Sequence, residues 1–140
     1  MIDEHVEERL RAFFSARAPG VVSAYLFGSV AEGRAHRESD FDAGVLLERG
    51  LFPSAEERME HRITLGSELV DVLDSNDVDV VILNDAPPEL GRAIVTRGRR
   101  VYCADTEADH AFVRDVQLRA ADLAPWLRRV RRLKLDALRS

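Results

Sequence analysis

The sequence has a single cysteine, Cys103, among its 140 residues. One thiol cannot form a disulfide within the chain or a cysteine-rich zinc site, so both ways of stabilising a small domain are excluded. No apolar run approaches the roughly 20 residues that a membrane-spanning helix needs. The first residues also lack the basic start and apolar core of a signal peptide. We therefore expect a protein of the reducing cytoplasm that makes no use of a membrane.

The sequence also has no excess of basic over acidic residues. The chain carries 25 acidic and 20 basic residues, for a net charge of -5. This balance argues against binding nucleic acid through a basic field over the whole surface, and no direct nucleic-acid contact is expected. One basic cluster stands near the end, at Arg128, Arg129, Arg131, Arg132 and Lys134. Such a run suits a solvated face at the end of a helix, and contact with RNA or an acidic partner is the alternative.

Hydrophobic periodicity and turn signals predict alternating helices and strands in a chain of one-domain size. Helices are expected over about residues 3–17, 54–70, 89–97 and 106–138, and strands over 21–27, 40–47, 77–83 and 100–103. Pro125 lies within the last helical segment and should kink it or break it into two helices. This order is that of a compact α/β domain with a helical C-terminal end. We divide it into residues 1–104 and C-terminal helices over 105–140 that pack on the same domain.

The most informative stretch begins where the first predicted strand ends. Gly28 and Ser29 follow that strand directly, and residues 30–33 are expected to form a turn of helix. Glycine lets a ligand approach the backbone, a helix N-terminus offers N–H groups to an anion, and a serine hydroxyl can donate to a phosphate oxygen. The pair therefore predicts a phosphate-binding turn, although an isolated Gly-Ser pair is also common in ordinary turns.

Two aspartates follow after a gap of ten residues. Asp40 and Asp42 stand two apart on a predicted strand, so their side chains leave the same face. Adjacent carboxylates repel each other unless a cation lies between them. Magnesium prefers such oxygen ligands and also binds nucleoside triphosphates, so the pair predicts a magnesium site. Ser39 either orients Asp40 or is an ordinary loop serine.

A third carboxylate lies on the third predicted strand, at Asp79. It shares a strand face with Val81 and Leu83, and a buried acid there would need a partner to offset its desolvation. If this strand lies beside the second, that partner is the same metal site, and a cap or salt bridge is the alternative. Three such aspartates suit the two-metal arrangement of phosphoryl transfer, in which Asp79 could also take the proton of the attacking hydroxyl.

Gly28-Ser29, the ten-residue gap, Asp40-Phe41-Asp42 and the later Asp79 resemble the signature of the polymerase-β-type nucleotidyltransferase superfamily. The short chain is similar to its minimal nucleotidyltransferase (MNT) branch, the antitoxins paired with HEPN toxins. This resemblance implies a small mixed β-sheet flanked by helices, ATP as substrate with two Mg²⁺ ions, and transfer of AMP to a tyrosine of a HEPN toxin. Glu32 stands where these antitoxins often carry a basic residue, which argues against a triphosphate contact from that position.

A helical stripe near the end has two interpretations. Apolar residues recur there at helical spacing, at Val113, Val116, Ala120, Leu123, Leu127, Val130 and Ala137. Such a stripe usually packs on its own domain, and the alternative is a docking face for another helical protein.

Three functions remain open at this point: a protein adenylyltransferase that silences a HEPN toxin, an enzyme that modifies a small molecule such as an aminoglycoside, and a non-catalytic antitoxin. The small-molecule enzymes usually carry an added substrate domain, for which this chain has little length. All three aspartates are present, which argues against loss of catalysis. The sequence leaves the oligomeric state open, including a homo-oligomer within a toxin–antitoxin complex.

Overall fold

The computed structural model describes residues 4–27 and 41–139, without the side chains of 123–128, 131 and 134–139. Its elements in chain order are α1 (Glu4–Ser15), β1 (Val21–Phe27), β2 (Phe41–Leu47), α2 (Ala55–Leu73), β3 (Val78–Ile82), the 3₁₀ turn η1 (Leu83–Asp85), α3 (Pro88–Arg97), β4 (Arg99–Cys103) and α4 (Thr106–Arg139). All four predicted strands are present in the predicted order. The helical turn predicted over residues 30–33 lies outside the described residues.

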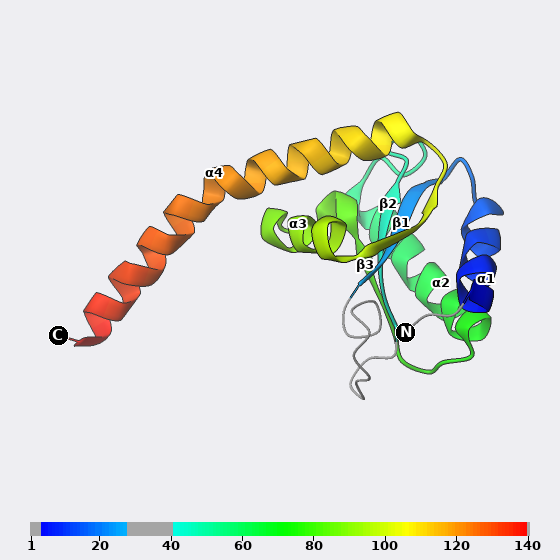
Figure 1. The fold of residues 1–140 in the computed structure, drawn as a ribbon, viewed down its shortest axis with the longest axis horizontal. Coiled ribbons are helices and arrows are strands. Elements are labelled where there is room, and N and C mark those ends of the chain that lie inside the picture. The colour runs from blue at the N-terminus through cyan, green and yellow to red at the C-terminus, as the bar shows by residue number, and fades with distance from the viewer. Residues whose placement is uncertain (1–3, 28–40, 140) are drawn as a thin grey trace.

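The four strands form one mixed sheet in the order β3-β2-β1-β4. β2 pairs parallel to β3, whereas β1 pairs antiparallel to both β2 and β4. Figure 1 shows α1 and α2 on one side of this sheet, and α3 with the first half of α4 on the other. The mixed sheet flanked by helices is therefore confirmed. The end of β1 and the starts of β2, β3 and β4 meet at one edge of the sheet.

The alternation of side chains along the strands builds a core on each face. On the side of α1 and α2 the buried residues include Leu10, Phe14, Ala24, Val45, Leu65, Leu69 and Val80. On the side of α3 and α4 they are Val22, Tyr25, Leu46, Leu83 and Ile94. Both faces of the sheet are thus covered, which explains why β1 reads as a nearly continuous apolar run.

The ends of α2 show how the chain fixes a helix locally. Ser54 is the N-cap, and its hydroxyl accepts a hydrogen bond from the Glu57 N–H at 3.1 Å. The helix continues to Leu73, beyond its predicted end near Val70. It stops at Asp74, which adopts the left-handed conformation with φ of 51° and donates its N–H to the Val70 carbonyl.

The last helix remains one element through Pro125, from Thr106 to Arg139. Its first half packs on α3 and β1, and its second half bends and extends beyond the sheet (Figure 1). The predicted kink is therefore present and the predicted break is not. Among the described residues, no helix is long and apolar enough to cross a membrane.

Candidate active site

Two of the three predicted carboxylates meet at the sheet edge where β1 ends. Asp42 of β2 and Asp79 of β3 are register partners in the parallel pair. Paired residues on adjacent strands project from the same face and lie about 5 Å apart. Asp42 is also the register partner of Phe27, the last residue of β1. The topology therefore meets the condition set from the sequence, that the third strand lies beside the second.

The surroundings of Asp79 differ from the sequence expectation in one respect. Asp79 is exposed, although Val80 directly after it is only 3% exposed. The carboxylate of Asp79 remains in contact with water, so it needs no partner to offset a loss of solvation. A cation bound between the two adjacent carboxylates would interact favourably with both.

The remaining predicted site residues are Gly28, Ser29, Ser39 and Asp40, and all four lie outside the described residues. The described part of the chain contains no group of three or more Asp, Glu, His or Cys side chains placed so that they could hold a metal ion together. Asp42 and Asp79 supply two oxygen-donor side chains of the kind that Mg²⁺ prefers, so the donor set fits this ion as far as it is described.

Helix α3 lies close over the sheet beside these carboxylates. A Cβ atom at Gly44 would lie 2.9 Å from Cγ2 of Ile94, and one at Gly98 would lie 2.8 Å from the Leu26 carbonyl oxygen. Neither distance is compatible with a side chain, so the two glycines permit the close approach of α3. Gly44 is two residues from Asp42 on the same strand face. The middle of α3 therefore lies over β2 at a position two residues from Asp42.

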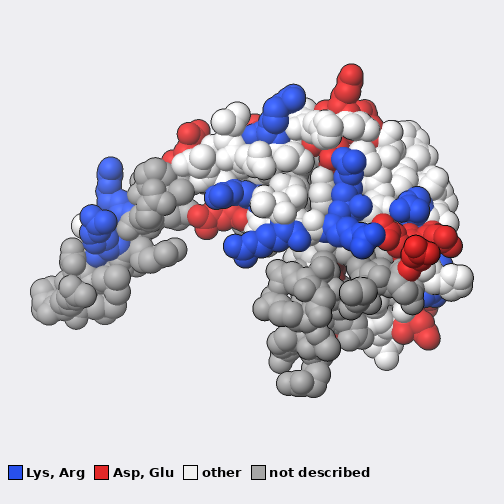
Figure 2. Space-filling model, viewed as in Figure 1, with Lys and Arg blue, Asp and Glu red and all other residues white. Residues whose placement is uncertain are grey.

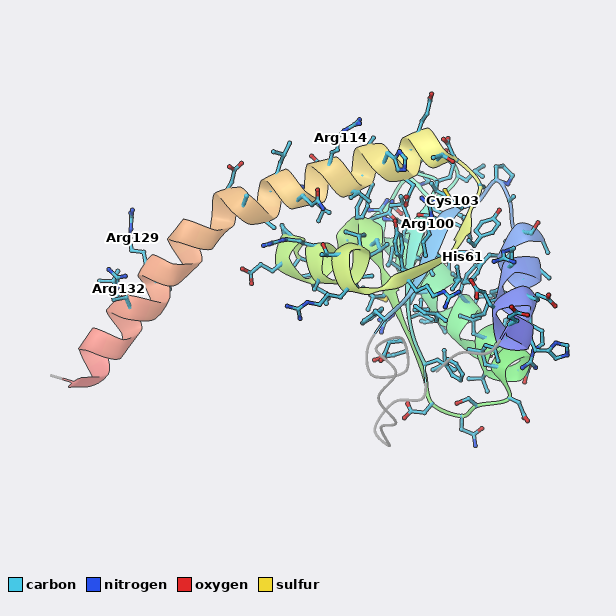
Figure 3. The ribbon with its side chains drawn as sticks, in the orientation of Figure 1. His61, Arg100, Cys103, Arg114, Arg129 and Arg132 are labelled. Carbon is cyan, nitrogen blue, oxygen red and sulfur yellow. The ribbon has the colours of Figure 1, made fainter. Side chains whose placement is uncertain are left out.

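A buried polar centre, which the sequence analysis missed, fixes the start of α4. Asp109 is 1% exposed and accepts hydrogen bonds from the Ser23 hydroxyl at 2.6 Å, the Tyr25 hydroxyl at 2.9 Å and the Arg100 guanidinium at 2.9 Å. Burial, followed by the hydrogen bond to Asp109, raises the pKa of Tyr25 well above its ordinary value. Figure 3 shows Arg100 close to the first turns of α4. The only sequence signal was a serine within the apolar run of β1, because Asp109 itself resembles an ordinary acid near a helix start.

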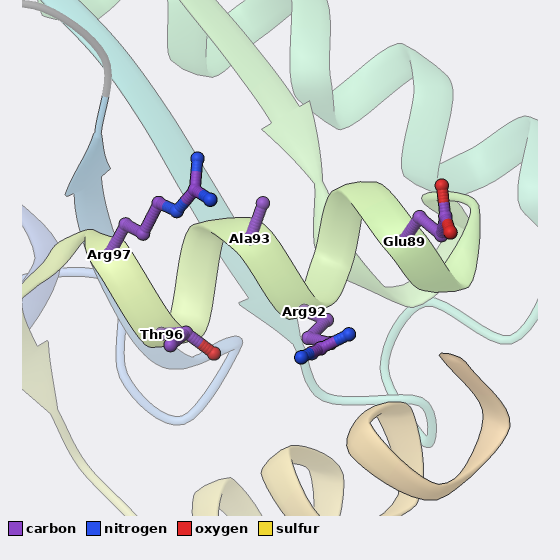
Figure 4. A pocket seen from close by; sticks show the side chains of 5 residues that line it. All are labelled: Glu89, Arg92, Ala93, Thr96 and Arg97. Atoms are coloured by element: carbon purple, nitrogen blue, oxygen red, sulfur yellow. The ribbon is translucent and has the colours of Figure 1, made fainter. Parts of the chain in front are cut away.

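Basic side chains gather over α3 and the strand that follows it (Figure 2). A surface pocket of about 250 Å³ lies on this helix, lined by Glu89, Arg92, Ala93, Thr96 and Arg97 (Figure 4). Neither Arg92 nor Arg97 belongs to the sequence motif that predicted the site. The edge of the sheet therefore combines adjacent carboxylates with a neighbouring source of positive charge, which is the combination that a metal-bound polyphosphate requires.

The chain is similar to known proteins over most of its length. The Shewanella oneidensis protein adenylyltransferase MntA is 30% identical over 112 residues, which cover 80% of this chain and 76% of MntA. A toxin–antitoxin structure with AMP-PNP has a TM-score of 0.68 and 28% identity, covering 96% of this chain and 98% of that one. A complex of the tri-AMPylated Shewanella oneidensis HEPN toxin with its MNT antitoxin has the same fold, with a TM-score of 0.64, 24% identity and coverage of 96% and 97%.

The model of the family described as polymerase beta, nucleotidyltransferase, matches residues 8–107. This range includes β1, β2, β3 and both described carboxylates. The chain belongs to the polymerase-β-type nucleotidyltransferase family.

Proposed function

We propose that this nucleotidyltransferase moves AMP from ATP to a tyrosine hydroxyl of a partner HEPN toxin, depends on Mg²⁺, and so acts as the antitoxin of the pair. The observation that carries the proposal is the register of Asp42 with Asp79 at the edge of the sheet. The similarity to the adenylyltransferase MntA and to a toxin–antitoxin structure with AMP-PNP supports both the nucleotide and the kind of partner.

The proposed roles of the site residues follow from their chemistry. Asp40, Asp42 and Asp79 would hold two Mg²⁺ ions, which when bound offset the charge of the triphosphate and make the acceptor hydroxyl more acidic. Gly28 and Ser29 would donate hydrogen bonds to phosphate oxygens, and Ser39 would orient Asp40. The proposed site thus combines Asp42 and Asp79 with four residues of the segment between β1 and β2.

The transfer itself requires a base and a suitable acceptor. The hydroxyl oxygen attacks the α-phosphorus of ATP, the bond to pyrophosphate breaks, and Asp79 takes the hydroxyl proton. Its exposed carboxylate can be reached by an incoming side chain. A tyrosine hydroxyl, with an ordinary pKa near 10, is easier to deprotonate than an aliphatic alcohol.

The partner is proposed to be a helical HEPN protein. A solved complex similar to this chain supports the proposal, because in it a tri-AMPylated HEPN toxin of Shewanella oneidensis is bound to an MNT antitoxin. In this chain, the second half of α4 extends beyond the sheet and carries Leu133, which is 62% exposed (Figure 1). We propose this extending half of α4 as the docking face for the helical partner.

The test is to incubate the purified protein with ATP, Mg²⁺ and the HEPN-like product of a neighbouring gene, and to measure the intact mass of that product. We expect mass increments of AMP that disappear with a chelator and with Asp42→Asn. The matched control is Asp71→Asn, an exposed acid on α2, which should transfer as wild type does.

Two outcomes would contradict the proposal. Tight binding of the HEPN protein without any mass increment would favour a non-catalytic antitoxin. Transfer to an aminoglycoside or another small alcohol, with none to the HEPN protein, would favour a small-molecule enzyme.

A further inference from the structure

One flank of α3 faces the strands that carry the carboxylates. Leu90, Ala93 and Arg97 share this flank, because they stand three and seven residues apart on a helix. Leu90 lines a surface pocket with Val81 and Ile82 of β3. On the other flank, Gly91 packs against α4, where an added Cβ would lie 2.9 Å from Val116. Arg97 therefore stands on the β2–β3 side of the helix.

Close contacts also fix how far along the sheet Arg97 lies. Ile94 packs directly over Gly44, whose register partner on β3 is Val81. One helical turn later, a Cβ at Gly98 would lie 3.3 Å from Cβ of Phe27, the register partner of Asp42. The last turn of α3 thus runs from the middle of the sheet to the edge with the carboxylates. Arg97 belongs to that turn.

The direction of the Arg97 side chain agrees with this placement. Figure 4 shows Arg97 and Ala93 on one side of α3, and Thr96 and Arg92 on the other. The Arg97 side chain points to the side of α3 from which β2 starts before it crosses behind the helix (Figure 4). It is exposed and lines the pocket of about 250 Å³ on α3.

The partners of the neighbouring arginines set Arg97 apart. The guanidinium of Arg99 lies 2.8 Å from a Glu7 oxygen, and that of Arg100 lies 2.9 Å from an Asp109 oxygen. Arg97 has no recorded hydrogen bond or ion pair with any residue in the described ranges 4–27 and 41–139. Its charge is therefore not used by the described part of the fold.

We propose that Arg97 binds the phosphate chain of the nucleotide whose metal site includes Asp42 and Asp79. The inference rests on the proposed function and adds a substrate-binding residue from α3, a helix that the sequence motif does not include. A guanidinium presents its N–H groups as a planar fork that matches two phosphate oxygens. The negative charge of the phosphate chain would then be offset by the guanidinium of Arg97 on one side and by the metal ions at the carboxylates on the other. AMP has a single phosphate, so it would make little of the contact with Arg97.

The test compares the binding of AMP-PNP and of AMP, both with Mg²⁺, by calorimetry. We expect Arg97→Ala to weaken AMP-PNP binding about ten- to hundredfold, as loss of charge-assisted hydrogen bonds does, and to leave AMP binding unchanged. Arg97→Lys should fall between the two because it keeps the charge and loses the fork. Arg114→Ala, an exposed arginine on α4 (Figure 3), is the matched control and should bind both ligands as wild type does.

Different results would contradict the role of Arg97 and the proposed function. Unchanged AMP-PNP binding in Arg97→Ala, with tight binding by the wild type, would overturn the inference and leave the proposed function standing. Equal weakening of AMP-PNP and AMP would also overturn it, because it would indicate a general disturbance of the site. A wild-type protein that binds neither ligand would overturn the proposed function and the inference together.

Discussion

Asp42 and Asp79 occupy the same register position on the parallel strands β2 and β3, although 36 residues separate them in the chain. The arrangement depends on β3 returning beside β2 after the long helix α2. The sheet thereby fixes both carboxylates on backbones that are hydrogen-bonded to each other, which limits how far they can move apart. Two elements of regular structure therefore position the part of the site that the structure describes.

This geometry separates nucleotide binding from transfer. We expect Asp79→Asn to keep binding of AMP-PNP with Mg²⁺ within a few-fold, because the other two proposed ligands, Asp40 and Asp42, would still hold the nucleotide-bound ion. Transfer to the HEPN partner should fall by at least about a hundredfold, since the variant loses both a metal ligand and the proposed base. A single-turnover assay with labelled ATP measures the loss.

The control for this prediction is Asp71→Asn, which removes an exposed acid from α2. It should match the wild type in both binding and transfer. Wild-type transfer rates in Asp79→Asn would instead mean that another carboxylate, such as Asp77, acts as the base.

The close approach of α3 to the sheet gives a prediction for stability. Gly44→Ala would place a Cβ 2.9 Å from Ile94 and 3.3 Å from Leu83, so the packing must shift. We expect the free energy of unfolding to fall by about 1–3 kcal/mol, as overpacking typically costs. Urea denaturation followed by circular dichroism measures this change.

Gly66 offers a matched comparison on α2. An alanine there would meet nothing nearer than Val80 at 3.8 Å, which is ordinary contact. Because alanine favours a helix over glycine, Gly66→Ala should be neutral or more stable by up to about 1 kcal/mol. Equal effects of the two substitutions would contradict the claim that Gly44 is required for packing.

The buried centre around Asp109 predicts a loss of stability in alkali. Burial and the Asp109 hydrogen bond raise the pKa of Tyr25, so the folded state favours the neutral phenol. An unfolded tyrosine ionises near pH 10, so this contribution is fully present below about pH 10 and is lost as the pH rises above that value. As the pH rises above about 10, the wild type should therefore lose stability more steeply than Tyr25→Phe does.

Urea unfolding at several pH values tests this difference. Tyr25→Phe should also be less stable than the wild type at neutral pH, because it removes the hydroxyl that donates to Asp109. Tyr102→Phe is the control, since Tyr102 is half-buried on β4 outside this centre, and its pH dependence should follow the wild type. Parallel pH profiles for wild type and Tyr25→Phe would contradict the prediction.

The sequence predicted what is local and missed what depends on packing. The apolar run of β1 and the two-residue spacing of strand side chains were sufficient to identify the strands and the face of Asp42. The end of α2 was missed because Asp74, a non-glycine residue, takes the left-handed position that glycine usually marks. The hydrogen bonds of Asp109 join residues more than 80 positions apart, which no local pattern indicates.

Arg97 shows the same limit within the site. Its place in the turn of α3 that reaches the end of the sheet with Asp42 depends on α3 lying against Gly44 and on Gly98 lying against Leu26 and Phe27, and this packing is visible only once the sheet order is known. The assignments of Gly28, Ser29, Ser39 and Asp40 stay predictions, as does the division of the chain at residue 104.

The last prediction concerns the surface that binds the partner. Leu133 lies on the half of α4 that extends beyond the sheet and is 62% exposed (Figure 1). Leu51, in the turn after β2, is 53% exposed on another part of the surface. Leu133→Asp and Leu51→Asp each remove one exposed leucine side chain. Neither substitution should lower the free energy of unfolding of the isolated protein by more than about 0.5 kcal/mol.

Their effects on the partner should differ. If α4 docks the HEPN protein, Leu133→Asp buries a charge in the interface and should weaken binding by at least about tenfold, whereas Leu51→Asp should not change it. Titration calorimetry of each purified variant with the HEPN protein measures the two affinities, and transfer of AMP should fall in parallel with binding at limiting partner concentration. Binding of free AMP-PNP should stay unchanged in both variants, because Leu133 and Leu51 lie on elements other than the strands that carry Asp42 and Asp79. A Leu133→Asp variant that binds the partner as the wild type does would exclude this half of α4 from the interface, and weakening by Leu51→Asp instead would place the interface near the turn after β2.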